Sequence, residues 1–369
     1  MRVVTKVPYD DLREAQAFAR KAEQAGLDGV IAAENAHNPY LLLAAAALAT
    51  ERLQLGAAVA MAFPRSPTIN AMISWDIHHA SRGRFYMGFG SQIKAHNERR
   101  YGIPWSAPAP RMRDYVGAIR AIWRCWQTEE PLDYHSEHYT LTLMTPNFSP
   151  RPNGLPTPPI SIAAVGPAML RVAGQFCDGV RLHPLTTRRL LEEVINVQID
   201  EGIKRGQRDR KNFEVMAGSF IATGPDEATV AKIREYVRYR IAFYCSTPGY
   251  WNVLRLHGIE DLGKKLNSYP REGRWKEMAA QVPDDVLNLF AVVGTYDTIA
   301  EQLKERYTGV VDTIALTAVP SDFDPVPLRE VVEAIQRVPT RFERYNTDWD
   351  VPKQPANKHI PSPALRERG

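Results

Sequence analysis

Two histidines lie where short apolar segments of the chain end, and this residue type can move protons near neutral pH. His37 follows the apolar residues 29–33, and His183 ends a second such segment, residues 179–183. An imidazole titrates near neutral pH, so a histidine with an accessible ring nitrogen can give or take a proton during catalysis. A structural alternative stays open for both: His37, for example, can hydrogen-bond a nearby carboxylate such as Glu34 and take no part in chemistry.

Small residues end three other apolar segments. They are Ala58 and Val59, then Gly90, Ser91 and Gln92, then Ala164, Val165 and Gly166. Small side chains let backbone N–H groups approach a flat ring or a phosphate. Residues 165–167 also open a predicted helix, whose N-terminal end attracts a phosphate. Each signal alone is typical of an ordinary turn, but together they predict a phosphate-bearing cofactor.

The remaining histidines and the cysteines indicate no metal site. His135 and His138 are three residues apart, and no third ligand is evident beside them. Cys125, Cys177 and Cys245 are far apart and odd in number, which predicts three reduced, buried thiols.

Two further groups of polar residues have weaker interpretations. His78 and His79 fall within a predicted helix and are expected to be structural. Lys94 and His96 face either a substrate anion or solvent.

The elements that must position these residues form a regular alternation. Eight apolar segments are predicted as strands: residues 3–7, 29–33, 53–60, 84–89, 159–164, 179–183, 213–222 and 310–317. Each is followed by a helical pattern, the clearest at residues 111–127. Eight such units predict a single (β/α)8 TIM barrel, with a doubly wound sheet as the alternative. No GxGxxG follows the first strand, which favours the barrel. In a barrel the candidate residues meet where the strands end.

Two irregular stretches interrupt the alternation and one follows it. We expect a barrel over residues 1–338, with insertions at 128–158 and 242–290 that cover the site and set specificity. Aromatic residues in the second insertion region, among them Tyr244, Tyr250 and Trp251, suggest an apolar or ring-bearing small-molecule substrate. Residues 339–369 read as an extended arm that packs along the barrel or a partner subunit, or as a solvated tail.

Composition excludes several classes of protein. The 369 residues carry a net charge of +4 without a long basic run, so nucleic acid is not an expected partner. The longest apolar run, residues 40–49, is about half of what a membrane span needs. The first residues lack the apolar core of a signal peptide, so we expect a cytoplasmic protein.

Several motifs in one register resemble the bacterial luciferase-like flavin superfamily. They are residues 26–30, 50–56, 65–67, 81–90, 111–116 and 173–179. The variant motifs at residues 94–96, 143–146 and 290–294 resemble the subgroup assigned to coenzyme F420, a deazaflavin, more than the luciferases proper. The resemblance runs from residue 1 to about 338. It implies a TIM barrel that binds an isoalloxazine-type ring where the strands end, and it implies a homodimer.

The resemblance also assigns roles to individual residues. In the family a bulge after the third strand, often with a non-prolyl cis peptide, supports the back of the ring, and Ala58–Val59 corresponds to it. The cofactor phosphate is expected at Gly90–Ser91 and at residues 164–166. Glu34 resembles the family's acidic residue before a catalytic histidine. The chain departs from the pattern because Asn35 follows Glu34 and the histidine is His37. It also has Gln92-Ile-Lys where some deazaflavin relatives carry a glutamate.

The resemblance implies an F420-dependent oxidoreductase that transfers a hydride between the deazaflavin and a carbonyl, an alcohol or an activated alkene. His37 or His183 is expected to handle the accompanying proton. The main alternative is a two-component FMN-dependent monooxygenase supplied by a separate flavin reductase. A flavin-binding protein without catalysis is a third possibility.

Overall fold

Eight parallel strands close into a ring in the computed structural model, which describes residues 1–8, 11–218, 220–316, 319–346 and 349. The strands of the ring are β1 (Arg2–Lys6), β2 (Gly29–Ala32), β3 (Gln54–Ala57), β5 (Phe85–Gly90), β8 (Ile160–Ala164), β9 (Gly179–Leu182), β10 (Glu214–Ala217) and β13 (Thr313–Leu316). Each pairs with the next in this order, and β13 pairs with β1. The predicted (β/α)8 barrel is therefore confirmed, and the open doubly wound sheet is wrong.

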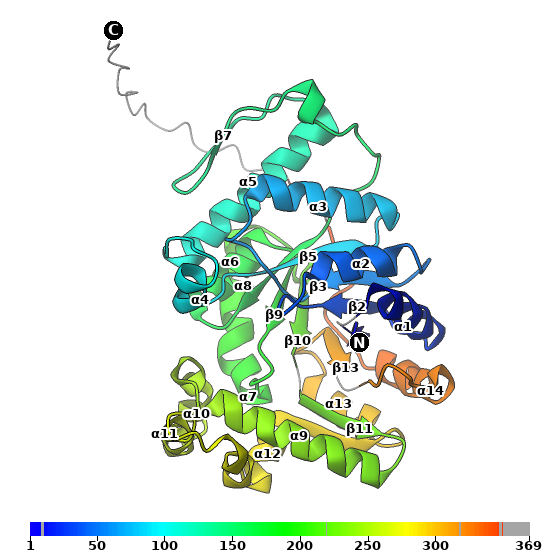
Figure 1. The fold of residues 1–369 in the computed structure, drawn as a ribbon, viewed down its shortest axis with the longest axis vertical. Helices are drawn as coiled ribbons and strands as arrows, with labels where there is room; N and C mark the ends of the chain where they lie inside the picture. The colour runs from blue at the N-terminus through cyan, green and yellow to red at the C-terminus, as the bar shows by residue number, and fades with distance from the viewer. Residues whose placement is uncertain (9–10, 219, 317–318, 347–348, 350–369) are drawn as a thin grey trace.

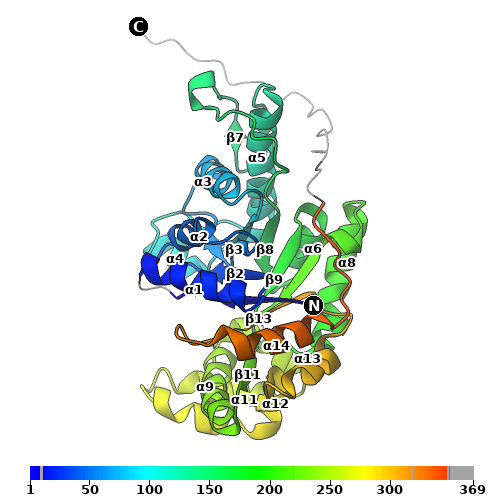
Figure 2. The same ribbon diagram turned by 90° about the vertical axis from the view of Figure 1, so that its right-hand side faces the viewer.

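Helices surround the barrel on its outer face (Figures 1 and 2). They are α1 (Leu12–Gln24), α2 (Pro39–Ala47), α3 (Pro67–Ala80), α4 (Lys94–Arg99), α5 (Pro108–Thr128), α6 (Pro167–Phe176), α7 (Arg188–Leu190), α8 (Asn196–Arg205), α13 (Ile299–Tyr307) and α14 (Pro325–Gln336). A π-helical turn, Leu191–Ile195, joins α7 to α8. The apolar stripe of α5 is buried throughout, as its 3.6-residue spacing predicts.

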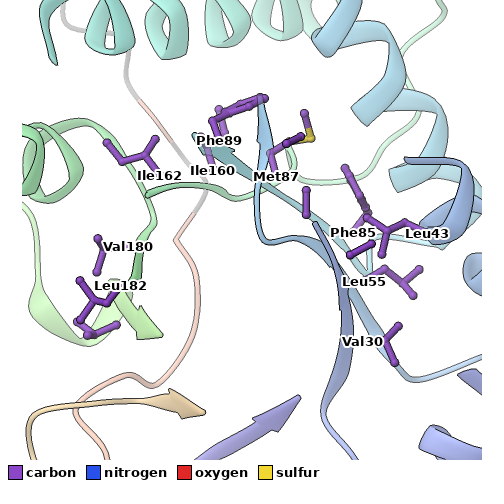
Figure 3. Packing of buried hydrophobic residues seen from close by; sticks show 14 of the residues in the cluster. Val30, Leu43, Leu55, Phe85, Met87, Phe89, Ile160, Ile162, Val180 and Leu182 are labelled. Carbon is purple, nitrogen blue, oxygen red and sulfur yellow. The ribbon is translucent and has the colours of Figure 1, made fainter. Parts of the chain in front are cut away.

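The barrel strands place their side chains on two sides in alternation. Val30, Leu55, Phe85 and Ile160 belong to the large core between strands and helices, part of which Figure 3 shows. Their neighbours along the strands form a smaller cluster of Val4, Ile31, Tyr86, Met216 and Ala315. Ala58 packs against this smaller cluster, which fills the interior of the barrel.

The strand expected at residues 213–222 is in fact two strands, and this is a correction. β10 ends at Ala217, and β11 (Phe220–Gly224) leaves the barrel to pair with β12 (Ala291–Thr295) in a separate parallel sheet. Both strands are buried, although in different sheets, and the apolar pattern therefore continues from one into the other.

A helical layer covers this second sheet. It contains α9 (Glu227–Cys245), α10 (Trp251–Leu256), α11 (Glu260–Ser268) and α12 (Asp284–Phe290). These helices share an apolar core of their own, in which Leu254, Leu266 and Phe290 are buried. In both views the layer lies at one end of the molecule, and the hairpin of β6 (Tyr134–His135) and β7 (Thr140–Leu141) lies at the other (Figures 1 and 2).

The N-terminal ends of the strands form a face that we call the barrel base, and charged side chains fill it. Glu214 accepts hydrogen bonds from Arg2 (2.8 Å), Arg181 (2.5 Å), Thr313 (2.6 Å) and the Tyr345 hydroxyl (2.5 Å). Burial opposes its ionisation, but Arg181 and then Arg2 outweigh that effect and lower the pKa of Glu214 to about 2.

Described residues of the predicted arm pack on this base. The backbone N–H groups of Arg341 and Phe342 donate to Asp312, each at 3.0 Å. Trp349 donates to Asp178 at 2.8 Å and lies against the guanidinium groups of Arg120 and Arg208. This favours packing along the barrel for these residues, while residues 350–369 of the arm lie outside the described part of the chain.

A membrane-spanning helix needs both length and apolar character, and none of the helices in the described residues combines the two.

Candidate functional site

The C-terminal ends of the strands form the opposite face, which we call the barrel mouth. Glu34 follows β2, Gln92 follows β5, Gly166 follows β8 and His183 follows β9. Because the strands are parallel, these residues meet at one face, as the sequence predicts. Neighbouring pairs in the register, such as Met61 with Gly90, bring the ends of adjacent strands side by side.

The segment between β3 and β4 (Ala60–Met61) interrupts the expected strand 53–60. The peptide bond between Ala58 and Val59 is cis, which agrees with the expectation from the resemblance. Hydrogen bonds join Ala58 N–H to the Ala32 carbonyl (2.8 Å) and Glu34 N–H to the Val59 carbonyl (3.0 Å). A Cβ atom on Gly88 would lie 1.9 Å from the Ala57 carbonyl oxygen. Glycine at position 88 is therefore what lets β5 approach this segment.

Glu34 holds this segment in place. Its carboxylate accepts a hydrogen bond from Met61 N–H at 2.7 Å and two from the Arg65 guanidinium, at 2.8 and 2.9 Å. Arg65 also lies over the ring of Tyr40. A carboxylate with these partners is arranged to position the backbone, so the structure favours a positioning role for Glu34, and its predicted catalytic role stays a prediction. Reasoning from the residues missed Arg65, although it opens the Arg65-Ser-Pro67 motif of the resemblance.

Side-chain hydrogen bonds hold the turn after β5. Gln92 has a φ of 57°, and its side-chain oxygen accepts from Ile93 N–H at 2.9 Å. The Asn97 side chain donates to the Ser91 carbonyl at 3.0 Å. Gly90 lies beside Val59, since a Cβ atom there would come within 2.8 Å of the Val59 side chain. The predicted cofactor residues Gly90, Ser91 and Gln92 are therefore adjacent to the cis peptide.

The turn after β8 presents an open helix end. Gly166 precedes α6, and its added Cβ atom would meet no atom of the described chain within 4 Å. Val165 beside it is half exposed. In the described residues no side chain caps the first turn of α6, and Gly166, Pro167 and Ala168 at this helix end are exposed. This is the arrangement that binds a phosphate.

His183 is enclosed by aromatic rings. It stacks on Tyr250 with 4.0 Å between ring centroids and meets Tyr244 edge-on at 4.4 Å. Its Nδ1 accepts from Leu185 N–H at 3.1 Å, which assigns the proton of the neutral ring to Nε2. Burial, with a smaller effect of Arg240, lowers the pKa of His183 to about 3. His183 is therefore a neutral hydrogen-bond donor at physiological pH.

His37 lies apart from His183. It is exposed in the bend at residues 35–37, between β2 and α2. The strands β2 and β9 are four steps apart in either direction around the ring, so the two histidines occupy opposite sides of the mouth. Both can border a ligand bound across the mouth, but the structure does not bring them together as a pair.

The other polar candidates have structural partners. His78 bonds the carbonyl groups of Phe85 and Pro156, each at 2.9 Å. Lys94 pairs with Glu98, and His96 is exposed. His138 bonds Asp114 at 2.8 Å rather than approaching His135.

One cluster of possible metal ligands and three free thiols bear on the expectation that the chain has no metal site. Asp114, Glu137 and His138 have ligand atoms within 4.8 Å of one another, but Arg113 also pairs with Asp114. Cys125, Cys177 and Cys245 are buried free thiols.

The mouth also contains residues that the sequence analysis did not select. Arg240 near the end of α9 bonds the hydroxyl groups of Tyr236 and Tyr244. Lys6 ends β1, and burial followed by the charge of Arg240 lowers its pKa. The spacing of Tyr236, Arg240 and Tyr244 at four-residue intervals on one helix face was the available signal.

Comparisons with known proteins now add relatives. Residues 2–313 match the profile of a family described as luciferase-like monooxygenase. An uncharacterised protein of Mycobacterium tuberculosis (strain H37Rv) is 44% identical over 308 residues, covering 84% of this chain and 90% of the relative. The 5,10-methylenetetrahydromethanopterin reductase of Archaeoglobus fulgidus is 29% identical over 327 residues, covering 86% and 93%. A putative coenzyme F420-dependent oxidoreductase of M. tuberculosis is 28% identical over 315 residues, covering 80% and 88%.

Solved structures share the fold. The coenzyme F420-dependent tetrahydromethanopterin reductase of Methanopyrus kandleri superposes with a TM-score of 0.75 at 20% identity, over 91% of this chain and 98% of that one. The oxygenating constituent of 3,6-diketocamphane monooxygenase from Pseudomonas putida, in complex with FMN, superposes with a TM-score of 0.60 at 18% identity, over 92% and 98%. At these identities the likeness is one of fold.

Proposed function

The chain belongs to the luciferase-like monooxygenase family, and we propose that it is an oxidoreductase that uses coenzyme F420. The proposed reaction is hydride transfer between the deazaflavin and a carbonyl, an alcohol or an activated alkene. Relatives named as an F420-dependent oxidoreductase and a methylenetetrahydromethanopterin reductase support a reductase of this kind. The observation that carries the proposal is the mouth itself, where the backbone of Ala58 and Val59 lies beside Gly90 and the uncapped helix end at Gly166 belongs to the same face.

The residues at the mouth fit such a cofactor. The backbone of Ala58 and Val59 would support one face of a flat ring, and Glu34 with Arg65 would keep that backbone in place. Gly166 and the first turn of α6 would hold a phosphate, together with Gly90 and Ser91. When bound, a deazaflavin supplies a carbon centre that gives or accepts a hydride.

Side chains of the mouth would serve the rest of the reaction. We assign the proton transfer to His37, because it is exposed beside the site. His183 would donate a hydrogen bond from Nε2 and orient the ligand, since a histidine with a pKa of about 3 is neutral at pH 7 and does not act there as a general acid. The barrel would hold ring and substrate face to face, which replaces a bimolecular encounter by proximity.

Cofactor titration tests this proposal. We expect the purified protein to bind F420 more tightly than FMN, and Gly166→Val to weaken F420 binding at least tenfold by filling the space at α6. Gly249→Val is the matched control, because Gly249 also faces open space within the described chain and has an ordinary φ. Binding of FMN alone, with an oxygen-dependent product, would favour the FMN monooxygenase instead. The family description and the FMN-bound structural neighbour support that second candidate, which requires a flavin reductase as partner.

We also propose a homodimer. Leu41 and Leu48 of the α2 segment and Ile69 and Met72 of α3 are exposed, and the two helices are neighbours. Apolar side chains grouped in this way are typical of subunit interfaces. The molar mass measured by light scattering after gel filtration should be twice that of the chain, and Leu48→Glu with Met72→Glu should return it to the monomer value.

A further inference from the structure

One side of the barrel mouth combines a cation with aromatic rings, and the hydride transfer itself gives this cation no task. Arg240 donates from Nη1 to the Tyr236 hydroxyl at 3.2 Å and from Nη2 to the Tyr244 hydroxyl at 2.5 Å. The ring of Tyr244 contacts His183, which in turn stacks on Tyr250. We call Arg240, Tyr244, Tyr250 and His183 the cationic wall.

We propose that the cationic wall recognises a substrate that carries a carboxylate next to a flat, apolar group. Arg240 binds the carboxylate, while Tyr250, Tyr244 and His183 contact the apolar part. This inference rests on the proposed function, because it treats the bound molecule as the partner of the cofactor in hydride transfer.

Arg240 has unused hydrogen-bonding capacity. A guanidinium has five N–H donors, and the two phenols take two of them. The Nε atom is buried and has no hydrogen-bond partner within the described residues. Arg181 at the barrel base also has buried donors without a partner, so the binding capacity of Arg240 rests on the Nη N–H donors that the two phenols leave over, to which a carboxylate would bind.

The charge of Arg240 is also unbalanced. No carboxylate of the described chain lies within ion-pair distance of its guanidinium, whereas Arg238 on the same helix bonds Asp284 (2.6 Å), Glu235 (3.0 Å) and the Val282 carbonyl (2.6 Å). Arg238 therefore serves the fold, with its donors occupied by protein groups. Arg240, one half-turn further along α9, is left with only neutral partners.

Two other basic groups lie near Arg240. Its charge lowers the pKa of Lys6 at the end of β1 and of His183 at the end of β9, in both cases after the larger effect of burial. Arg240 therefore brings positive charge to this side of the mouth, where His183 stays neutral. An anion is attracted to Arg240, and the adjacent rings give an apolar contact surface for the rest of the ligand.

A pair of matched probes tests the inference. Benzoate and benzamide have nearly the same shape, but only benzoate is charged. By calorimetry, we expect the full chain to bind benzoate at least tenfold more tightly than benzamide. Arg240→Gln should abolish this preference, and Arg240→Lys should keep part of it, because lysine retains the charge without the planar fork. Arg274→Gln is the control: Arg274 lies in the same helical layer but pairs with Glu272 and Glu277. It should leave the preference unchanged.

Further measurements separate this inference from the proposed function. Tyr250→Ala should weaken both probes while the preference for benzoate persists. F420 carries acidic groups of its own, so its affinity is measured for the same proteins and should be unchanged in Arg240→Gln. An equal loss of F420 affinity would reassign Arg240 to the cofactor and overturn the substrate assignment. A benzoate preference that survives Arg240→Gln in a folded protein, or no preference in the wild type, would also overturn it. A wild type that prefers benzoate but does not bind F420 would keep the anion site and refute the proposed function.

Discussion

One arginine at the barrel mouth differs in its partners from the arginines at the barrel base. At the base, Arg2 and Arg181 donate to the buried carboxylate of Glu214, and Arg120 and Arg208 donate to Asp178. At the mouth, Arg240 bonds two phenols and has no carboxylate partner among the described residues. The arginines at the base therefore stabilise the fold, as Arg65 does at the mouth through Glu34, whereas Arg240 has no anion of the described chain as its partner.

This difference follows from what each end must do. Charges at the base are buried, and a buried charge is tolerated only where a partner satisfies it. Residues 341, 342, 345 and 349 add partners from the end of the chain, although Arg181 and Arg210 keep buried donors without a partner among the described residues. A binding site needs a charge without a partner anion, and open space; among the described residues the mouth provides the first at Arg240 and the second at Gly166. Stability and function are in this way placed at opposite ends of one barrel.

Glu214→Ala removes the central carboxylate of the base, and of the variants considered we expect it to have the largest effect on stability. Without this carboxylate Arg2 and Arg181 are buried without their anion, so the free energy of unfolding should fall by about 3–5 kcal/mol. Urea denaturation measures the loss. Glu301→Ala, which removes an exposed pair with Lys304, should cost less than about 1 kcal/mol. A loss of similar size in both variants would show that the base network does not stabilise the fold.

The same network should make stability depend on acid pH. The pKa of Glu214 is lowered to about 2 in the folded state, so the folded state favours its charged form. Its contribution is complete above the ordinary carboxyl pKa and is lost as the pH falls from about 5 towards 2, by on the order of 3 kcal/mol. Urea denaturation across this pH range should show the loss in the wild type and a smaller one in Glu214→Gln. Parallel profiles would exclude Glu214 as its source.

At the mouth, we expect His37→Ala to change catalysis and to leave the stability of the fold unchanged. We expect turnover to fall about 100-fold, the lower range for general acid–base catalysis, while F420 affinity and thermal stability stay unchanged. The matched control is His96→Ala, an exposed histidine on α4. If turnover is unchanged, His37 has no part in the mechanism.

Much of the fold could be predicted because strand and helix patterns are local. Six of the expected strands coincide with single strands of the ring. The strand expected at residues 53–60 is interrupted at Ala58–Val59. The exception is residues 213–222, which form two strands in two sheets. An apolar run indicates burial, but it does not say which sheet buries it, and β11 pairs with β12 more than sixty residues later.

For the candidate site, the face at which its residues meet was predictable, but their contacts were not. Gly166 and His183 follow strands, so their meeting at one face follows from the parallel barrel. The ion pair between Glu34 and Arg65 and the stacking of His183 on Tyr250 could not be predicted, because each contact joins residues from different strand–helix units. Arg240 has a local signal in its four-residue spacing from Tyr236 and Tyr244, but that spacing does not say whether a distant carboxylate also reaches the guanidinium, as Asp284 does at Arg238.

The amino-acid sequence alone determined the order of strands and helices, and with it the face at which the polar residues meet. Periodicity and capping carry that information within each unit. The tertiary structure decided which charges are paired and which remain available. That outcome depends on distances between segments far apart in the chain, such as Tyr345 with Glu214 and Arg240 with the end of β9. A side chain's chemistry is set by its neighbours in space, and these are known only once the barrel has closed.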